Sequence, residues 1–229
     1  MPTEVLNRGM FSDFRTARRV HQSILAGPEK RVLIWVGERI PAWVNSDHLT
    51  VLGFAAQIGT GVCYALSRFN RFWLMAAILC LALNWFGDSL DGTLARVREN
   101  QRPRYGFYVD HILDSIGSVA LMAGLALSGY MSPWVATGLL VLFLLLSIQS
   151  YLATYTLGEF HLSFFRFGPT ELRVLLAIGN LALFSRSYVL GGHRLFDIGG
   201  MAGIAGMSAM FVFFTAKNIR RLYSEERIR

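Results

Sequence analysis

The sequence predicts an all-α integral membrane protein with six transmembrane helices and an N-terminal amphipathic helix at the membrane interface. Of its 229 residues, 53% are hydrophobic and only 16% are charged, and the apolar residues gather into long runs. Several runs approach or exceed the ~20 residues that a helix needs to cross ~30 Å of hydrocarbon. A soluble domain of this length does not require such runs, so a membrane protein is expected.

The chain begins with a polar, basic segment. Residues 1–48 are expected to lie in the cytoplasm, ahead of a single membrane domain formed by residues 49–229. The first thirty residues contain no apolar stretch followed by small residues. A cleaved signal peptide is therefore not expected, and the first span would act as its own insertion signal.

Within this segment, Arg31–Val44 is predicted to form a helix that lies in the cytoplasmic interface. Its apolar side chains are Val32, Trp35, Val36 and Trp43, and its charged side chains are Arg31, Glu38 and Arg39. The stretch is too short to span, and Pro41 would end or bend it. A solvated linker is the alternative, but it would leave two tryptophans in water.

Six apolar segments are predicted to span the membrane: Leu49–Leu66, Phe72–Val97, Gly106–Leu127, Pro133–Thr156, Pro169–Phe184 and Leu195–Lys217. Six spans put both ends of the chain and two loops on one side, which then holds 18 of the 22 Lys and Arg residues. Such an excess marks the cytoplasmic side, although Arg68 and Arg71 run against it. The net charge of +7 is therefore explained by the membrane topology, and it would also favour binding to anionic lipid surfaces. No nucleic-acid partner is expected.

The two cysteines, Cys63 and Cys80, lie inside apolar runs. Free cysteine commonly behaves as a small buried hydrophobe. No disulfide or metal thiolate is therefore expected.

Acidic and small residues recur at helical spacing on two consecutive spans. Residues three, four and seven apart share one helix face. The second span has Asp88, Asp91, Gly92 and Ala95 on one stripe, and the third has Gly106, Asp110 and Asp114 on another. Because these helices are antiparallel and joined by a short loop, the stripes can face each other. The rise of ~1.5 Å per residue puts all four acids at a similar depth near the cytoplasmic headgroups.

Four carboxylates gathered at this depth need compensation, because each charge at the bilayer centre costs at least ~2.5 kcal/mol. Proton sharing is one remedy, and a divalent metal with oxygen ligands, such as Mg²⁺, Mn²⁺ or Ca²⁺, is a better one. Arg96, one turn further, could supply a fixed positive charge for phosphate oxygens. The alternatives are a polar helix contact for the acids and close helix packing for Gly92, Ala95 and Gly106.

This pattern resembles the signature of the CDP-alcohol phosphotransferase (CDP-alcohol phosphatidyltransferase) family. The matching residues are Asp88, Asp91, Gly92, Ala95, Arg96, Gly106, Asp110 and Asp114. The resemblance implies an enzyme of phospholipid biosynthesis that moves a substituted phosphate from a CDP-linked donor to an alcohol and releases CMP. It also implies a homodimer and a bacterial or archaeal inner membrane. The depth of the four acids and the excess of Lys and Arg on their side of the membrane predict an active site that faces the cytoplasm.

The resemblance further implies roles for individual residues. Asp88, Asp91, Asp110 and Asp114 would hold Mg²⁺ or Mn²⁺, in one or two ions, and Asp114 would also be the general base. Gly92, Ala95, Arg96 and Gly106 would line the CDP pocket. One departure is Asp47, which stands where the family often has Asn and for which helix capping is the simpler interpretation.

The substrates remain open between two branches of the family. Asp110-His111 and Gly168-Pro169-Thr170-Glu171 resemble segments of the enzymes that use CDP-choline or CDP-ethanolamine, whereas the short six-span layout resembles bacterial CDP-diacylglycerol enzymes. The alternatives are that Pro169 simply begins a helix and that His111 lies on a helix surface. Arg166, Arg173 and His111 are candidate acceptor-binding residues, with membrane anchoring as the alternative for the arginines. Outside the family, the alternatives are an ion-coupled transporter and a non-catalytic CDP-lipid binder.

Overall fold

The computed structural model describes residues 18–20, 26–161, 168–185, 188–189 and 192–227, and within them it is almost entirely helical. The helices are α2 (Ala26–Gly37), α3 (Ser46–Ser67), α4 (Trp73–Val97), α5 (Pro103–Ser128), α6 (Pro133–Leu157), α7 (Pro169–Ser185) and α8 (Leu195–Glu225). The short strands are β1 (Arg18–Val20), β2 (Glu159–His161), β3 (Tyr188–Val189) and β4 (His193–Arg194). The all-α fold class is therefore as predicted.

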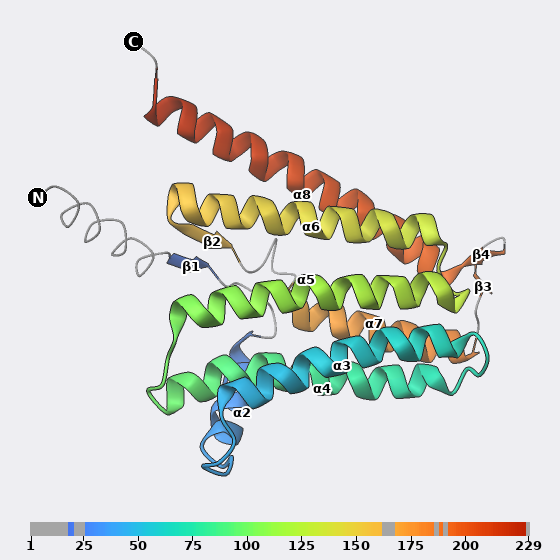
Figure 1. Ribbon diagram of the computed structural model, residues 1–229. Coiled ribbons are helices and arrows are strands. Elements are labelled where there is room, and N and C mark those ends of the chain that lie inside the picture. The colour runs from blue at the N-terminus through green and yellow to red at the C-terminus, as the bar shows by residue number, and fades with distance from the viewer. Residues whose placement is uncertain (1–17, 21–25, 162–167, 186–187, 190–191, 228–229) are drawn as a thin grey trace, which may run out of the picture.

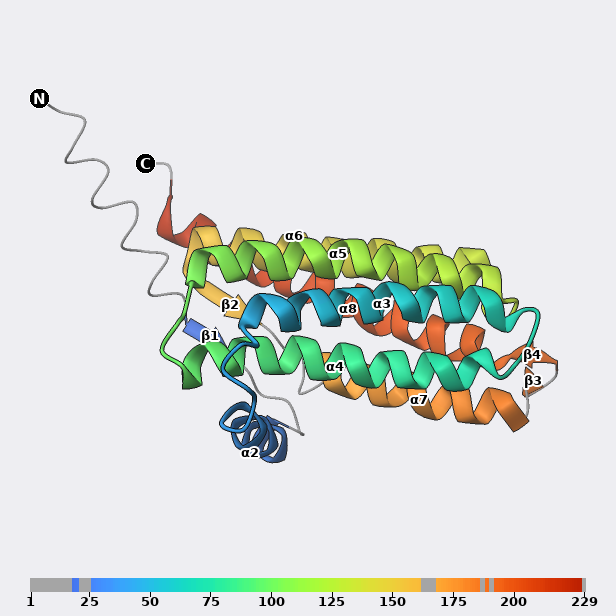
Figure 2. The ribbon, with the colours of Figure 1, turned by 60° about the horizontal axis from the view of Figure 1, so that its bottom comes forward.

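The six helices from α3 to α8 form an up-and-down bundle (Figures 1 and 2). α3 packs against both α4 and α5, and these three helices form its centre. α6 packs on α5 and α8, while α7 packs on α4. Parallel pairing of β1 with β2 ties the N-terminal segment to the connection between α6 and α7. This pairing was not predicted.

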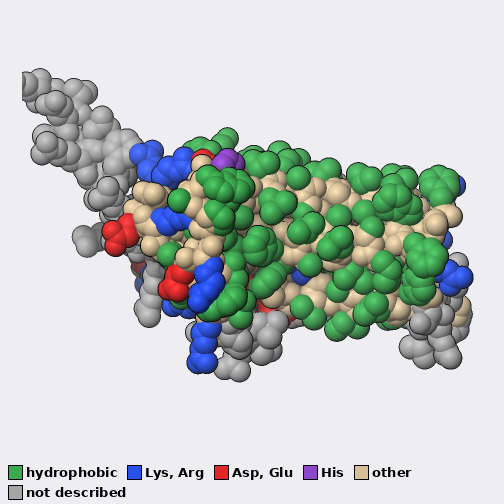
Figure 3. Space-filling view, turned by 90° about the horizontal axis from the view of Figure 1, so that it is seen from below, with side chains coloured by type: hydrophobic (Ala, Val, Ile, Leu, Met, Phe, Trp, Pro, Cys, Tyr) green, Lys and Arg blue, Asp and Glu red, His purple; other side chains and the backbone are tan. Residues whose placement is uncertain are grey.

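Five of the described helices are long and apolar enough to cross a membrane: α3, α4, α5, α6 and α8. Figure 3 shows hydrophobic side chains over the middle of the visible face and charged side chains towards its two ends. That distribution is the one a bilayer-spanning bundle requires, because hydrocarbon excludes charge. Five of the six predicted spans thus fall on helices that suit a membrane.

The predicted fifth span, Pro169–Phe184, corresponds to α7, which has 17 residues. At ~1.5 Å per residue this helix is about 26 Å long, shorter than the ~30 Å of hydrocarbon. It is fixed to the bundle by a buried hydrogen bond, in which the Tyr64 hydroxyl of α3 donates to Asn180 Oδ1 at 3.0 Å. Whether α7 crosses the membrane by itself stays a prediction.

The N-terminal helix α2 differs in position from the predicted interfacial helix. It begins at Ala26 and ends at Gly37, before Pro41, and its axis crosses those of the bundle helices (Figure 2). Leu33 is buried against α3 and α4, whereas the side chains of Trp35 and Trp43 are 57% and 77% exposed. The apolar contact of the helix with the bundle is therefore made by Leu33 and the partly buried Val36, while Trp35 and Trp43 face outward. The location of the helix in the interface stays a prediction.

Arg98 holds the linker between α2 and α3 against the end of α4. Its guanidinium donates to the carbonyl oxygens of Ile40, at 2.9 Å, and Pro41, at 3.0 Å, and also to that of Val44. Backbone carbonyls in an irregular segment need such partners. The sequence placed Arg98 only among the basic residues of the cytoplasmic side, so this structural role was not predicted.

The beginning of α3 corrects the interpretation of Asp47. The N-cap is Asn45, whose side chain accepts from the His48 amide at 3.1 Å, and the His48 ring accepts from the Asn45 amide at 3.3 Å. Asp47 lies in the first turn and forms an ion pair with Arg102. The capping interpretation of Asp47 is wrong because the helix begins earlier than predicted, which moves the cap to Asn45.

Close helix approach in the bundle centre depends on glycine. A Cβ added at Gly61 of α3 would lie 2.3 Å from the Ala120 carbonyl oxygen of α5, and one at Gly87 of α4 would lie 2.5 Å from the Gly53 amide nitrogen of α3. Atoms cannot approach so closely, so these backbones can pack at this distance only without side chains. The result is that α4 and α5 are both held close to α3.

We expect Gly61→Ala to destabilise the protein, because one methyl group forces α3 and α5 apart. Overpacking of this kind costs about 1–3 kcal/mol. Gly206→Ala in α8 is the matched control, since a Cβ there meets nothing within 4 Å. Thermal unfolding in detergent should show a lower midpoint for Gly61→Ala and an unchanged or higher one for Gly206→Ala. Equal midpoints for the two variants would contradict the packing argument.

Candidate active site

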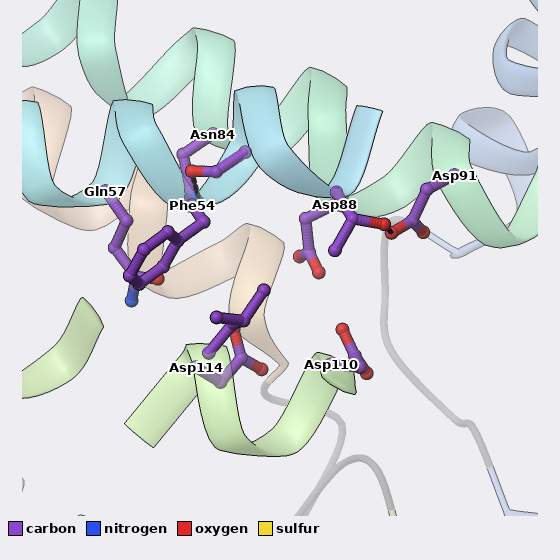
Figure 4. Close-up of a pocket in the computed structure, with 10 residues that line it drawn as sticks. Phe54, Gln57, Asn84, Asp88, Asp91, Asp110 and Asp114 are labelled. Atoms are coloured by element: carbon purple, nitrogen blue, oxygen red, sulfur yellow. Dashed lines mark hydrogen bonds between the residues drawn. The ribbon is translucent and has the colours of Figure 1, made fainter. Parts of the chain in front are cut away.

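The acidic stripes of α4 and α5 face each other across a small pocket. Asp88, Asp110 and Asp114 each place a carboxylate oxygen within 4.8 Å of the others. Figure 4 shows Asp88 and Asp91 on one side of this pocket and Asp110 and Asp114 on the opposite side. Because α4 and α5 both pack on α3, two stripes separated in sequence become one cluster. The facing arrangement follows the predicted spacing.

Asp91 lines the same pocket but has its own partners. The Thr50 hydroxyl of α3 donates to Asp91 Oδ2 at 2.6 Å, and the Gly92 amide donates to its Oδ1. It lies outside the set of three carboxylates that approach within 4.8 Å. Its role as a metal ligand therefore stays a prediction.

The third wall of the pocket comes from α3, which the sequence analysis did not include. Thr50, Gly53, Phe54 and Gln57 line the pocket together with the acids. Their spacing of three, four and seven residues places them on one face of the helix. A search for polar and small residues at this spacing on the first span would have found Thr50, Gly53 and Gln57. The pocket is partly open and has a volume of about 20 Å³, which is enough for roughly one water molecule or a small ion.

Asn84 and Arg173 add an amide and a positive charge beside Asp88. The Arg173 guanidinium of α7 contacts Asp88 Oδ2 at 2.5 Å, and its Nε donates to Asn84 Oδ1 at 2.7 Å. Asn84 Nδ2 in turn donates to the Gly53 carbonyl oxygen at 2.9 Å. The Arg173 side chain is only 14% exposed. This cation is therefore largely buried and in contact with the acidic cluster, and its role in acceptor binding stays a prediction.

The chemistry of the cluster suits a divalent cation. Its donors are carboxylate oxygens, and the described residues of the cluster include no Cys or His. Hard cations such as Mg²⁺, Mn²⁺ and Ca²⁺ prefer oxygen ligands, and Mg²⁺ commonly combines a few carboxylates with substrate phosphates. A converging set of three acids partly enclosed by helices fits such an ion.

Gly92, Ala95, Arg96 and Gly106 lie towards the end of α4 and at the start of α5, on the side of the acids that is nearer the α4–α5 loop. A Cβ added at Gly92 would meet only the Arg96 side chain, at 3.5 Å, and one at Gly106 would meet nothing within 4 Å. Close helix packing therefore does not explain these two glycines. Arg96 donates to the Thr93 hydroxyl at 3.0 Å.

A separate recess opens beside Ala95. It has a volume of about 210 Å³ and is lined by Ala42, Asn45, Ser46, Leu94, Ala95, Arg98 and Asn100. These residues come from the linker before α3, the start of α3, the end of α4 and the loop that follows α4. The carbonyl contacts of Arg98 fix the linker that forms one wall. The recess is polar on several sides and far larger than the pocket between the acids.

His111 is directed towards α6. Its ring stacks on Phe107 with centroids 4.2 Å apart and meets the Tyr151 ring edge-on at 5.0 Å. Its Nδ1 lies 2.7 Å from the Phe107 carbonyl oxygen and 3.5 Å from Asp110 Oδ2. His111 thus adjoins the acidic cluster without lining its pocket. Its role in acceptor binding stays a prediction.

Arg166 lies outside the described residues. The segment that follows it begins α7, with Pro169 at the first position and Glu171 Oε2 accepting from the Gly168 amide at 2.9 Å. Pro and an acidic residue are favoured in the first turn of a helix. This geometry supports the interpretation of Gly168–Glu171 as a helix start.

The acidic cluster lies within the part of the chain that matches a known protein family. The family model described as CDP-alcohol phosphatidyltransferase matches residues 43–215, which is more than half of the chain and includes all four aspartates. No curated protein matches the sequence.

Proposed function

The chain belongs to the CDP-alcohol phosphatidyltransferase family, whose members are membrane transferases of phospholipid synthesis, and from this we propose that it transfers a substituted phosphate from a CDP-linked donor to an alcohol and releases CMP. The observation that carries the proposal is the convergence of Asp88, Asp110 and Asp114 from two helices on one small pocket. Such an arrangement has little purpose inside a membrane protein unless it binds charge, because intramembrane acids are costly.

The family is generally dependent on divalent metal, and Asp88, Asp91, Asp110 and Asp114 are proposed to hold Mg²⁺ or Mn²⁺, in one or two ions. When bound, such an ion neutralises charge on the diphosphate and stabilises the leaving phosphate. Of the four acids, Asp91 is the one restrained by Thr50, so it is oriented before any ligand arrives. The other three supply the converging oxygens.

Asp114 is the proposed general base. Its carboxylate would take the proton of the acceptor hydroxyl while the hydroxyl oxygen forms a bond to the phosphorus distal to cytidine. The bond between that phosphorus and the bridging oxygen breaks, and CMP leaves with the bridging oxygen. Asp114 suits this role because it lies about three helical turns inside α5, one turn deeper than Asp110, and lines the pocket together with residues of α3 and α4. Phosphoryl transfer of this kind depends on positioning and charge neutralisation.

The CDP group is proposed to bind on the cytoplasmic side of the acids, along Gly92, Ala95, Arg96 and Gly106. The open space over Gly92 and Gly106 allows a diphosphate to approach the backbone. The recess of about 210 Å³ beside Ala95 has room for a nucleobase. An active site at this end of the bundle would face the cytoplasm, the side expected to be richer in Lys and Arg.

Arg173 is proposed to bind the phosphate or head group of the acceptor, with Arg166 and His111 as further candidates. Its guanidinium already lies at the acidic pocket, and guanidinium pairs well with phosphate. We expect Arg173→Ala to weaken binding of a phosphorylated acceptor by at least about tenfold, since charge-assisted hydrogen bonds are the strong ones. Isothermal titration with the acceptor measures this, and Arg68→Ala at the other end of α3 is the control. Unchanged affinity would remove Arg173 from acceptor binding.

The finer identity of the substrates follows from one assay. Purified protein in lipid nanodiscs is supplied with CDP-diacylglycerol, CDP-choline or CDP-ethanolamine, several soluble alcohols or diacylglycerol, and Mg²⁺ or Mn²⁺. We expect metal-dependent release of CMP with CDP-diacylglycerol and a soluble alcohol. Release only with CDP-choline or CDP-ethanolamine would select the other branch. Binding of CDP-lipid without release would identify a binder, and ion flux without release would identify a transporter. Crosslinking in the same nanodiscs tests the proposed homodimer. Expression of the protein in a bacterial or archaeal cell, followed by isolation of the inner membrane, tests the proposed location.

A further inference from the structure

Glu29 of α2 forms a polar junction between three helices. Its Oε1 accepts hydrogen bonds from Trp85 Nε1 at 2.7 Å and the Ser89 hydroxyl at 3.0 Å, both on α4. It also accepts from the Thr170 hydroxyl of α7 at 3.1 Å. Three donors on one oxygen of a carboxylate make a strong junction, because hydrogen bonds to charged groups are stronger than neutral ones.

This junction lies next to the contact between Arg173 and Asp88. On α4, Trp85 and Ser89 directly follow Asn84 and Asp88, which are the two partners of Arg173. On α7, Thr170 is three residues before Arg173, so the two side chains share one helix face. The interface between α4 and α7 therefore contains two adjacent groups of polar contacts, one around the carboxylate of Glu29 and one around the guanidinium of Arg173.

The placement of α7 depends heavily on these polar contacts. Its N-terminal turn follows residues 162–167, and Leu172, Val174 and Leu175 are all exposed in the chain. The first two turns of α7 therefore meet the bundle mainly through Thr170 and Arg173. Without an acceptor for Thr170, the first turns of α7 would be held against α4 mainly by Arg173, while the Tyr64–Asn180 hydrogen bond would still fix the later part of the helix.

We propose that Glu29 is a positioning residue whose carboxylate joins α2 to α4 and α7 and so holds Arg173 on Asp88 and Asn84. The N-terminal helix thereby becomes part of the assembly that forms the site. The inference goes beyond the aspartate motif, since Glu29 lies outside the matched residues 43–215. Its kinetic consequence rests on the proposed function, whereas its structural consequence does not.

The structural consequence is tested by hydrogen–deuterium exchange on Glu29→Ala, Thr170→Val and the control Glu38→Ala. Glu38 also belongs to the N-terminal segment, but it is exposed and its ion pair with Arg39 is 3.9 Å long. We expect amides of Leu172–Ile178 to exchange at least about threefold faster in Glu29→Ala and Thr170→Val, because local opening follows the loss of buried hydrogen bonds. Glu38→Ala should match the wild type, as should α5 in every variant. Wild-type exchange of α7 in either test variant would overturn the proposal.

The kinetic consequence is tested by a double-mutant cycle with Arg173→Lys, using CMP release. We expect Glu29→Ala to lower kcat by about tenfold, and Glu29→Gln by less, since its amide oxygen still accepts hydrogen bonds but lacks the charge. In the Arg173→Lys background, Glu29→Ala should cause less than about a twofold further loss, because coupled residues are not additive. Losses that multiply would show that Glu29 does not act through Arg173 and would overturn this part. If the wild type releases no CMP, the proposed function fails, while the exchange experiment still decides the role of Glu29.

Discussion

Replacing Asp114 by Asn is expected to reduce turnover by at least about 10²–10³-fold, because a positioned general base contributes about that much to a proton transfer. Asn has nearly the same shape as Asp but cannot accept the hydroxyl proton. The pocket around Asp114 is formed by side chains from three helices, so the fold should tolerate the isosteric change. The measurement is CMP release at saturating donor and acceptor.

The same variant should keep most of its affinity for CDP. The proposed CDP-binding residues Gly92, Ala95 and Arg96 lie nearer the end of α4 than the cluster does, and Asp114 lies deeper. Titration with CDP in the presence of Mg²⁺ is therefore expected to give a dissociation constant within about threefold of the wild type. The binding free energy would then change by less than the ~1.4 kcal/mol that corresponds to a tenfold change in the dissociation constant. Glu225→Gln, a neutralised acid on α8 whose partner is Arg221, is the control for charge loss alone. Near-normal turnover in Asp114→Asn would show that another group is the base.

Removal of divalent metal is expected to abolish CMP release altogether, and Mg²⁺ or Mn²⁺ should restore it. The converging oxygens of Asp88, Asp110 and Asp114 are the ligands on which this expectation rests. Each carboxylate supplies both a negative charge and an oxygen ligand. Substituting a residue that only contacts a metal ligand typically weakens metal binding by ~10–100-fold. Asp110→Asn removes a proposed ligand itself and should therefore weaken Mn²⁺ binding by more than this. Electron paramagnetic resonance of free Mn²⁺ measures the binding directly, without any turnover.

Asp197→Asn provides the matched control for the metal experiment. Asp197 is an acid in the first turn of α8, where Oδ1 accepts from the Ser132 amide at 2.6 Å, far along the chain from the cluster. Asn retains an oxygen that can accept this bond, so the variant should bind Mn²⁺ as the wild type does. Equal Mn²⁺ affinity in Asp110→Asn and Asp197→Asn would contradict the assignment of the cluster as the metal site.

The two acidic stripes could be predicted from the sequence because helical periodicity is a local property. Asp88 and Asp91, or Asp110 and Asp114, are within one turn of each other on the same helix. A short loop between two apolar segments also makes them antiparallel neighbours. The cluster of Asp88, Asp110 and Asp114 is the direct result.

Other parts of the site had only a weak signal or none. The face of α3 formed by Thr50, Gly53 and Gln57 has helical spacing, but polar residues on a span do not reveal which neighbour they contact. The sequence analysis interpreted Asp47 as the cap of α3, whereas the N-cap is Asn45, two residues earlier. The difference depends on where the helix begins, which is the least certain feature of any sequence-based prediction.

By itself, the sequence determined the helical membrane fold, the family and the acids that face one another. The tertiary structure alone decided that Arg173 contacts Asp88, 85 residues away, and that Thr170 contacts Glu29, 141 residues away. The physical reason is that periodicity fixes which residues share a face of one helix, whereas the packing of α7 and α2 on α4 fixes which faces meet. That packing depends on close glycine contacts and polar junctions distributed over the whole chain, which no local pattern encodes.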